Sequence, residues 1–532
     1  MKKSHVKKIA ALTLAGCVAC MNMMLSGCGK NEEEANAGDT KTFSYWVTLP
    51  GQIATTADNY NDVLMYQQRE KDSGIHIEFI HPSASQVSEQ FNLMIASGEV
   101  PDMIEYNWMA YPGGPQKAIE DKIIIPLNDY IDKYAPNFKK AMTDRDELSP
   151  FYARESKTDN GDYFAFPNLN VGTARIFAGP LIRKDWLDEL GLPVPETIDE
   201  WTTALKAFKE KKGAKAPLSA TNEYFSTVNS FNGAFNVGQR LYLDGDKVKF
   251  GPMEDGYKDY LTLMNNWYKE GLIDRDYATN QRPILDTKMI SGEAGSTFLS
   301  LGAGLGVYLN QMKEKDPDYN LVCAPYPVLN KGDKNNFSSF EGDVVDMSVA
   351  ITTSCKDPVA AVKWLDYWYS EEGYKLLNFG VEGESYNMVD GKPVYTDDIL
   401  HNPNGMSVNT AISMACRATL AAPGFRQAPE YLEQYYQFPQ QTEGFKLWAE
   451  NVDGVRKTSI PKSLSPTIEE SEEYAALSAD ITTYVDEMCL KFVSGEEPIE
   501  NYDEFRSTLK SQFNTDRYLE IAQNMYNRYL ER

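Results

Sequence analysis

Histidine is scarce in this chain, and the common catalytic motifs are missing. The 532 residues include 4 histidines. His5 falls in the N-terminal leader, and His76, His81 and His401 stand alone. No HExxH, GxSxG, P-loop or dinucleotide-binding glycine motif occurs, so the usual signatures of zinc proteases, serine hydrolases and nucleotide enzymes are absent. We therefore expect no catalysis, no cofactor and no metal. A surface glycosidase stays an alternative, because 77 acidic residues make any carboxylate pair uninformative.

Basic residues are also few relative to acidic ones. Lys and Arg number 52 against 77 Asp and Glu, a formal net charge of −25. Such a surface repels phosphate backbones, which excludes nucleic acid as a partner. Hydrophobic residues make up 42% and charged residues 24%, the balance of a globular protein. The length suggests several domain-sized units.

Long apolar runs are confined to the N-terminus, which is typical of a processing segment. Four lysines precede an apolar stretch, and residues 25–28 read Leu-Ser-Gly-Cys. This end resembles a bacterial lipobox, so we expect residues 1–27 to be a lipoprotein signal peptide and Cys28 to be acylated. An ordinary signal peptide with an incidental cysteine is the alternative. Residues 28–40 are small and polar, as in a flexible tether. These features predict a lipid-anchored protein on the extracellular face of the cell membrane.

Cysteine offers no framework for the mature chain. Cys17 and Cys20 lie in the leader. Four cysteines follow far apart, which fits neither a zinc site nor a compact disulfide framework. They are Cys323, Cys355, Cys416 and Cys489. We favour four isolated buried thiols, although an exported protein could pair some of them.

Strand and helix patterns alternate from residue 42 onward. Residues 43–47, 75–80 and 102–106 have strand patterns, and the helical stretches between them end at Gly74 and Gly98. This order predicts parallel βαβ units in an open α/β sheet. Ligands of such sheets bind beyond the carboxyl ends of the strands. Those ends are Trp46 to Gln52, His81 to Ser83 and Tyr106 to Trp108.

A second α/β region begins near Arg175, with a strand pattern at residues 176–178. Thr197 and Glu200 have the spacing of a capping box at a helix start. Another helix is predicted from Asp357, and the last ninety residues have a mainly helical pattern. Residues 159–162 read Asp-Asn-Gly-Asp, which we interpret as an exposed turn rather than a calcium loop, because no fitting ligand series follows.

Aromatic side chains are abundant, with 32 tyrosines, 23 phenylalanines and 8 tryptophans. Aromatic faces bind the C–H faces of sugar rings, while amides and carboxylates bind the hydroxyls. Most aromatics in an α/β domain nevertheless belong to the core. We rank first the two tryptophans at predicted strand ends, Trp46 and Trp108. The remaining candidate ligand contacts are Tyr45, Asn107, Asn170, Asn236, Phe298 and Tyr386.

Several segments together resemble one known family, the extracellular solute-binding proteins (family 1) of ABC importers, and in particular the LipO-like lipoproteins of Gram-positive bacteria. The resemblance covers residues 42–532. The matching segments are Ser97 to Asp102, Ile125 to Leu127, Tyr134 to Asn137, Tyr163 to Pro167, Arg183 to Pro195, Glu270 to Asp274, Gly380 to Tyr386 and Gln523 to Arg528. Where the family has Glu-His-Tyr, this chain has Glu384-Ser385-Tyr386, so its specificity can differ.

The resemblance implies an α/β fold of two lobes, the type II periplasmic-binding-protein-like fold, with a ligand cleft between the lobes and a helical C-terminal region. By analogy, lobe 1 holds residues 41–168 and 322–379, and lobe 2 holds 169–321 and 380–532. It further implies a monomer that captures a carbohydrate, most simply an oligosaccharide, and delivers it to membrane permease subunits. The alternatives are a peptide-binding importer component, a surface glycosidase and a sugar sensor without a permease.

Overall fold

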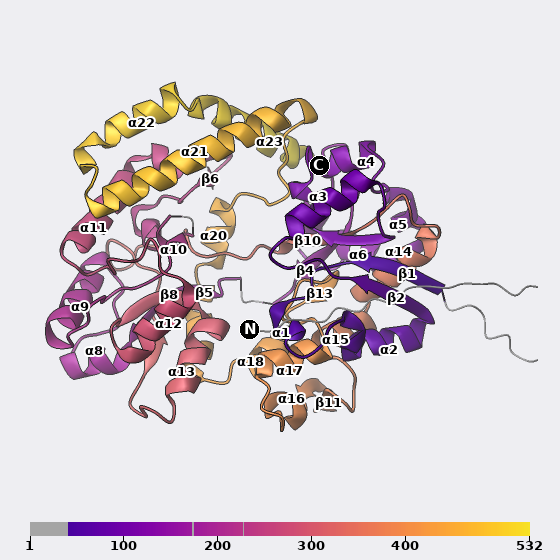
Figure 1. The fold of residues 1–532 in the computed structure, drawn as a ribbon, viewed down its shortest axis with the longest axis horizontal. Helices are drawn as coiled ribbons and strands as arrows, with labels where there is room; N and C mark the ends of the chain where they lie inside the picture. The colour runs from indigo at the N-terminus through magenta and orange to yellow at the C-terminus, as the bar shows by residue number, and fades with distance from the viewer. Residues whose placement is uncertain (1–40, 173–174, 227) are drawn as a thin grey trace, which may run out of the picture. The chain divides into compact units, whose positions relative to one another are not determined.

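The computed structural model describes residues 41–172, 175–226 and 228–532. The expected signal peptide, the acylated Cys28 and the tether lie outside the described residues. Lys41–Arg532 forms one compact unit (Figure 1). Among the described residues, no helix has both the length and the apolarity needed to span a membrane.

A six-stranded sheet organises the N-terminal part of the chain. Its spatial order is β13 (Gly424–Arg426), β4 (Phe166–Asn170), β10 (Val344–Ile351), β3 (Met103–Tyr106), β1 (Lys41–Trp46) and β2 (Ile75–Ile80). Strand β1 pairs in parallel with both β2 and β3, as the alternating pattern predicted. Strand β10 runs antiparallel to β3 and β4, whereas β13 is parallel to β4. The carboxyl ends of β1, β2, β3, β4 and β13 therefore share one edge.

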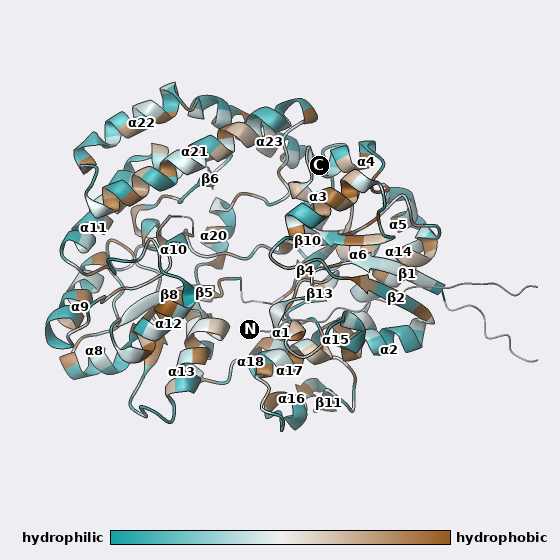
Figure 2. Ribbon diagram, viewed as in Figure 1, coloured by the Kyte–Doolittle hydropathy of each residue, from teal (hydrophilic) through white to brown (hydrophobic). Residues whose placement is uncertain are grey.

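Neighbouring residues of a strand point to opposite faces of the sheet. Both faces are covered by other parts of the chain. Tyr45 packs in a large core on one face, and Trp46 packs with Phe91 and Tyr106 on the other. Hydrophobic and hydrophilic residues alternate along the helices, as expected of helices with one buried face (Figure 2). The helices that accompany the sheet are α1 (Gly51–Ala54), α2 (Leu64–Ser73), α3 (Val87–Ser97), α4 (Gly114–Glu120), α5 (Asn128–Tyr134), α6 (Pro136–Thr143), α7 (Ser149–Glu155), α14 (Pro358–Asp366), α15 (Glu371–Phe379), α16 (Asp397–Leu400), α17 (Val408–Ala415) and α18 (Pro429–Tyr435).

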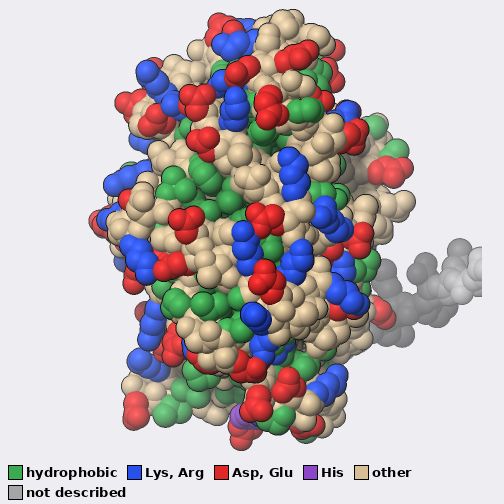
Figure 3. Space-filling model, turned by 90° about the vertical axis from the view of Figure 1, so that its left-hand side faces the viewer, with side chains coloured by type: hydrophobic (Ala, Val, Ile, Leu, Met, Phe, Trp, Pro, Cys, Tyr) green, Lys and Arg blue, Asp and Glu red, His purple; other side chains and the backbone are tan. Residues whose placement is uncertain are grey.

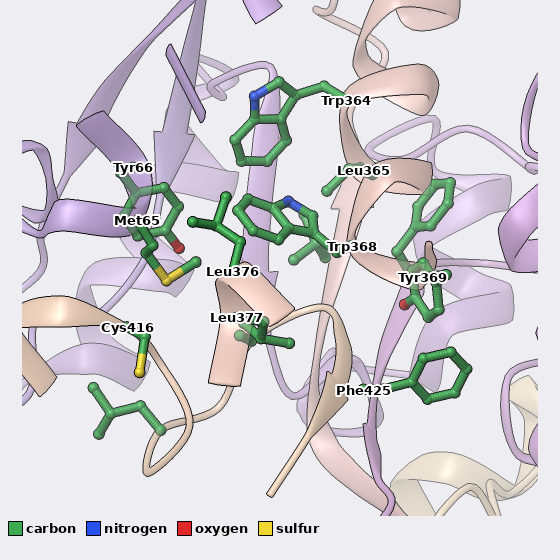
Figure 4. Close-up of a cluster of buried hydrophobic side chains, with 14 of the residues drawn as sticks. Met65, Tyr66, Trp364, Leu365, Trp368, Tyr369, Leu376, Leu377, Cys416 and Phe425 are labelled. Carbon is green, nitrogen blue, oxygen red and sulfur yellow. The ribbon is translucent and has the colours of Figure 1, made fainter. Parts of the chain in front are cut away.

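The large core brings together distant parts of the sequence (Figure 4). Tyr66 of α2 meets Trp368, which follows α14, with ring centroids 6.1 Å apart. Leu377 of α15, Cys416 and Phe425 of β13 belong to the same core. The hairpin of β11 (Tyr386–Val389) and β12 (Lys392–Tyr395) also packs here through Tyr386 and Tyr395. Residues 386–432 are therefore part of the first sheet's core.

A buried ion pair crosses this core. The Arg417 guanidinium donates to both carboxylate oxygens of Glu105 on β3, at 2.7 and 3.1 Å, and each side chain is 2% exposed. Tyr45 donates to the same carboxylate at 2.6 Å, and Arg417 donates to the Tyr66 hydroxyl at 2.8 Å. The carboxylate and both terminal amino groups of the guanidinium are hydrogen-bonded, which makes the charges tolerable in an apolar interior, and the buried Arg417 Nε has no partner.

A second sheet forms from the middle of the chain, with β5 (Ala178–Arg183) antiparallel to both β8 (Ser296–Ser300) and β9 (Leu321–Cys323). Its first strand begins at Ala178, two residues later than the sequence pattern predicted. The Thr197–Glu200 capping box is present and opens α9. The helices of this part are α8 (Lys184–Leu190), α9 (Ile198–Lys211), α10 (Glu223–Ser226), α11 (Asp255–Lys269), α12 (Arg282–Ser291), α13 (Val307–Met312), α19 (Pro439–Ala449) and α20 (Val452–Thr458).

The C-terminal region is helical, as expected, with α21 (Ile468–Ser494), α22 (Tyr502–Ser511) and α23 (Thr515–Glu531). Helix α23 packs on the hairpin of β6 (Leu241–Asp244) and β7 (Lys247–Phe250) through Ala522, Tyr526 and Tyr529. The last residue, Arg532, donates to Asp159 at 2.8 Å and to the Lys157 carbonyl at 2.8 Å. The end of α23 is thus attached to the loop that precedes β4.

Two smaller expectations are also met. Residues 159–162 form a turn, and the Asp159 carboxylate accepts from both Arg528 and Arg532, each at 2.8 Å. The four cysteines of the described chain are free and buried. On the surface, acidic and basic side chains are interspersed (Figure 3). Exposed ion pairs of this kind contribute little to stability.

The buried pair predicts a large effect for Glu105→Gln. The change removes the carboxylate and leaves the Arg417 charge uncompensated in the core, so we expect a loss of about 3–5 kcal/mol in the free energy of unfolding, measured by chemical denaturation. Glu99→Gln, at an exposed position, changes the net charge equally and should stay within about 0.5 kcal/mol of the wild type. A loss below about 1 kcal/mol for Glu105→Gln would show that the pair is not needed.

Candidate functional site

The carboxyl end of β13 opens onto a cavity of about 290 Å³, which we call the strand-end cleft. Both parts of the chain contribute to it: Arg426 ends β13 of the first sheet and Gln52 lies in α1 beside it, whereas Ser300 ends β8 of the second sheet and Phe177 precedes β5. The complete lining is Gln52, Phe177, Ser300, Gly302, Ala303, Glu341, Asn409, Thr419, Arg426, Gln427, Tyr431, Leu432, Tyr435 and Tyr436. Its position agrees with the rule that ligands bind beyond the carboxyl ends of parallel strands.

Tyrosine rings form one wall of the strand-end cleft. Helix α18 starts with Pro429 in its first turn, and the spacing of Tyr431 and Tyr435 places them on one helix face. Their rings stack, with centroids 5.4 Å apart and an interplanar angle of 24°. Tyr436 lies against Tyr435 at 5.5 Å. Burial raises the pKa of Tyr435, so its phenol is neutral at physiological pH and can donate or accept hydrogen bonds.

Phe177 contributes an aromatic side chain from the second-sheet side. It immediately precedes β5 and is 39% exposed, although most large aromatic side chains of the chain are buried. An exposed phenylalanine in a concave site provides an apolar face without filling the cavity. The strand-end cleft therefore has aromatic surface from both sheets.

An ion pair provides the charged groups of the strand-end cleft. Arg426 donates to one oxygen of Glu341, and the amide of Asn170 donates to the other at 3.2 Å. The Arg426 side chain is 5% exposed and that of Glu341 is 21% exposed. The carboxylate can therefore still accept a hydrogen bond from a ligand, whereas the guanidinium is largely covered.

Two glycines allow close approaches of the chain around the strand-end cleft. A Cβ on Gly302 would lie 2.6 Å from the Tyr435 hydroxyl, so the glycine lets the ring reach the loop after β8. A Cβ on Gly172 would lie 2.4 Å from the Gln427 carbonyl. Gln427 itself has φ 57°, in the left-handed region that non-glycine residues rarely adopt. Such strain is often found at binding sites.

A second and larger cavity, of about 800 Å³, lies where α7, α20, α23 and the β6–β7 hairpin meet. The Asp343 carboxylate on its wall accepts from Arg175 at 2.8 Å and from Arg456 at 3.0 Å. Asp343 is 1% exposed, so its two ion pairs stabilise the packing of the segments that cross between the sheets. We prefer the strand-end cleft because its aromatic rings and hydrogen-bonding groups meet at strand ends. Among the described residues, no group of three or more His, Cys, Asp or Glu could hold a metal ion.

The residues ranked first from the sequence are not in the lining of the strand-end cleft. Trp46 is 4% exposed and packs beside Phe91, with centroids 6.0 Å apart. Trp108 is 1% exposed and borders a small cavity of about 30 Å³. Tyr45 is fully buried and bonds to Glu105. Their roles as ligand contacts stay predictions.

The other predicted residues are dispersed. Asn107 caps a short 3₁₀ helix by accepting from the Met109 N–H at 3.1 Å. The Asn170 amide donates to the Glu341 carboxylate, and Asn236 borders a separate surface pocket. Phe298 packs against Tyr224, and Tyr386 packs against Phe379. Ser385, where the family has histidine, is 1% exposed and its hydroxyl donates to the Phe379 carbonyl at 2.6 Å. Asn170 is thus hydrogen-bonded to a lining side chain.

The lining side chains were mostly missed from the sequence. Gln52 lies in the segment from Trp46 to Gln52, which the strand pattern predicts to follow a strand and to face the ligand. Tyr431 and Tyr435 lie in α18, a helix that no sequence motif predicted. The signal available was their density, since residues 431–436 read Tyr-Leu-Glu-Gln-Tyr-Tyr. Phe177 falls in the predicted strand at residues 176–178 and is not among the predicted ligand contacts.

Comparison with known proteins gives a consistent result. Residues 54–375 match the family described as bacterial extracellular solute-binding protein. The fructooligosaccharide ABC transporter substrate-binding protein FusA of Streptococcus pneumoniae serotype 4 (strain ATCC BAA-334 / TIGR4) is 24% identical over 504 residues, 88% of this chain and 87% of FusA. Lipoprotein LipO of Bacillus subtilis (strain 168) is 25% identical over 406 residues, 74% of this chain and 76% of LipO.

A solved structure has the same fold. The crystal structure of the alginate-binding protein AlgQ2 without calcium ion superposes with a TM-score of 0.71 at 25% identity. The superposition covers 92% of this chain and 98% of AlgQ2.

The contact between Gly302 and Tyr435 is testable by stability. Gly302→Ala should lower the free energy of unfolding by about 1–3 kcal/mol, because the added methyl group forces the tyrosine ring to move. Gly51→Ala is the matched control, since a Cβ there meets nothing within 4 Å.

Thermal denaturation of Gly302→Ala, Tyr435→Ala and the double variant separates the contact from other effects of either change. If the ring causes the loss, adding Gly302→Ala to Tyr435→Ala should cost little further stability. Additive losses would mean that the two residues do not meet.

Proposed function

Because the chain belongs to the bacterial extracellular solute-binding protein family, we propose that it captures an oligosaccharide in the strand-end cleft and delivers it to an ABC permease. The resemblance seen in the sequence and the type II solute-binding fold are both confirmed. The family consists of substrate-binding components of transporters rather than enzymes. For this chain we propose binding and release without any chemistry on the sugar.

The tyrosine wall of the strand-end cleft is the observation that carries the proposal. Partly exposed rings of Tyr435, Tyr436 and Phe177 offer apolar faces on which the C–H side of a sugar ring can be buried. Glu341 and the amides and hydroxyls of the lining supply hydrogen-bond partners for the sugar hydroxyls. A cavity of about 290 Å³ accommodates part of an oligosaccharide, and the rest would extend along the opening.

We further propose that the two sheets are the centres of two lobes that close on the ligand. Segments near residues 171–177, 324–343 and 436–440 connect the two cores. The packing supports two changes to the boundaries expected from the sequence. Residues 380–435 belong with lobe 1, because Tyr386 and Tyr431 lie in its core. The segment that begins at residue 322 belongs with lobe 2 as far as Phe337, because β9 pairs with β5 and Tyr326 and Phe337 pack in the cores of the second part. Ligand contacts from both lobes would favour the closed state.

The cellular setting of the proposal rests on the N-terminal sequence and the relatives. We propose that Cys28 is acylated and holds a monomer on the extracellular face of the cell membrane. LipO, a named lipoprotein, and FusA, a named transporter component, support this setting. Metabolic labelling with a fatty-acid analogue should mark the wild type and not Cys28→Ser.

The proposed function is tested by thermal shift of residues 28–532 carrying Cys28→Ser, against oligosaccharides and short peptides. A ligand at about 100 times its Kd adds about 2.7 kcal/mol of stability, which gives a visible rise in Tm. A rise with an oligosaccharide supports the proposal. A rise with peptides alone would replace the ligand class, and release of reducing ends would indicate a glycosidase.

Phe177→Ala and Tyr435→Ala should each weaken oligosaccharide binding by about 1–3 kcal/mol, because each removes an apolar face from the strand-end cleft. Titration calorimetry measures the affinity. Phe513→Ala is the control, because this half-buried ring packs on Tyr484 at 4.5 Å among the C-terminal helices. Equal affinity in Phe177→Ala, Tyr435→Ala and Phe513→Ala would place the ligand elsewhere.

A further inference from the structure

Charge is nearly absent from the lining of the strand-end cleft. Among its lining residues, Glu341 and Arg426 are the ionisable residues apart from the tyrosines, and they are paired with each other. A tyrosine phenol is uncharged at neutral pH. The lining therefore carries one positive and one negative group, which cancel.

Arg426, the one cation of the lining, already takes part in an ion pair. Arg426 is 5% exposed at its side chain and donates to Glu341. Arg282 donates to the Ala303 carbonyl at the edge of the cleft, but its Nε is held by Asp286 at 2.5 Å. The Nε of Arg426 has no hydrogen-bond partner, but it is buried with the rest of the guanidinium, and Arg282 is occupied by Asp286 and the Ala303 carbonyl, so neither presents an exposed fork to a second carboxylate.

This arrangement has different consequences for neutral and acidic sugars. A hydroxyl entering the strand-end cleft needs one or two hydrogen-bond partners, and the Glu341 carboxylate, amides and tyrosines provide them. A uronate carboxylate would lose its hydration without gaining a cation, and it would approach Glu341. The whole chain, with a formal net charge of −25, adds a repulsive field.

We infer that the strand-end cleft takes neutral oligosaccharides and rejects uronate-containing ones, with the Glu341–Arg426 pair as the determinant. The inference rests on the proposed function and names the substrate class of that same site. It is not implied by the relatives, because FusA is named for a neutral fructooligosaccharide and AlgQ2 for alginate, a polyuronate. Glu341 accepts from the sugar hydroxyls, while its pairing keeps Arg426 from binding a carboxylate.

The test compares an acidic oligosaccharide with its neutral methyl ester. Tetragalacturonate and its fully methyl-esterified form share ring, linkage and length, and a neutral fructooligosaccharide of similar length is added as a third probe. Binding to residues 28–532 with Cys28→Ser is measured by calorimetry at low salt, since Lys41–Arg532 forms one compact unit. We expect the neutral probes to bind at least about 100-fold more tightly than tetragalacturonate.

A second measurement addresses the ion pair. Glu341→Gln keeps the size of the side chain, removes the negative charge and frees Arg426, so the preference for the methyl ester over the acid should fall by about 10-fold or more. Glu384→Gln, at an exposed position outside the lining, makes the same change in net charge and should leave the preference unchanged.

Each outcome has a distinct meaning. Tetragalacturonate binding as tightly as its ester overturns the inference and leaves a carbohydrate-binding protein. An unchanged preference in Glu341→Gln overturns the role of the pair. If Glu341→Gln does not fold, the wild-type comparison still decides the charge preference. Failure to bind any of a broader set of neutral and acidic oligosaccharides overturns the proposed function itself.

Discussion

The Arg417–Glu105 pair is the interaction on which the strand-end cleft depends most. It joins β3 to a segment more than three hundred residues later, and all its partners lie in one core. A buried arginine needs a partner for its charge, and this need restricts where residues 416–426 can lie against the sheet. Strand β13 and helix α18 follow directly, and they carry Arg426 and the tyrosine wall. The pair therefore sets the position of the site without touching it.

Ion pairs of a second kind hold the segments that cross between the sheets. Asp343 binds Arg175 of another crossing segment and Arg456 of α20, and Arg532 fastens the end of α23 to the loop before β4. These contacts lie on the side of the larger cavity, whereas the strand-end cleft has a close approach of Tyr435 to Gly302. This distribution is compatible with a hinge near the ion pairs and an opening at the strand-end cleft, the motion that the proposed function requires.

Much of the fold could be predicted from local patterns, and little of the site could. The parallel pairing of β1, β2 and β3, the capping box at Thr197 and the helical C-terminus follow from signals within a few residues. Trp46 and Trp108 were correctly placed at strand ends, but the structure buries their rings. The alternating pattern of a strand shows that successive side chains point to opposite faces of the sheet. It does not show which helices will cover each face. The tyrosine wall comes from residues 431–436, far along the chain from the strands that it faces.

The sequence by itself determined the family resemblance and the α/β class, because these depend on order and short motifs. Its N-terminus and composition led to the expectations of export, anchoring and no nucleic-acid partner. Tertiary structure alone decided which aromatic rings remain open and which charges are neutralised. Phe177 is exposed and Trp108 is buried for reasons that lie in their neighbours. The Glu341–Arg426 pair joins residues that are 85 positions apart. Burial and charge compensation are properties of contacts between distant residues, and only the folded chain brings those contacts together.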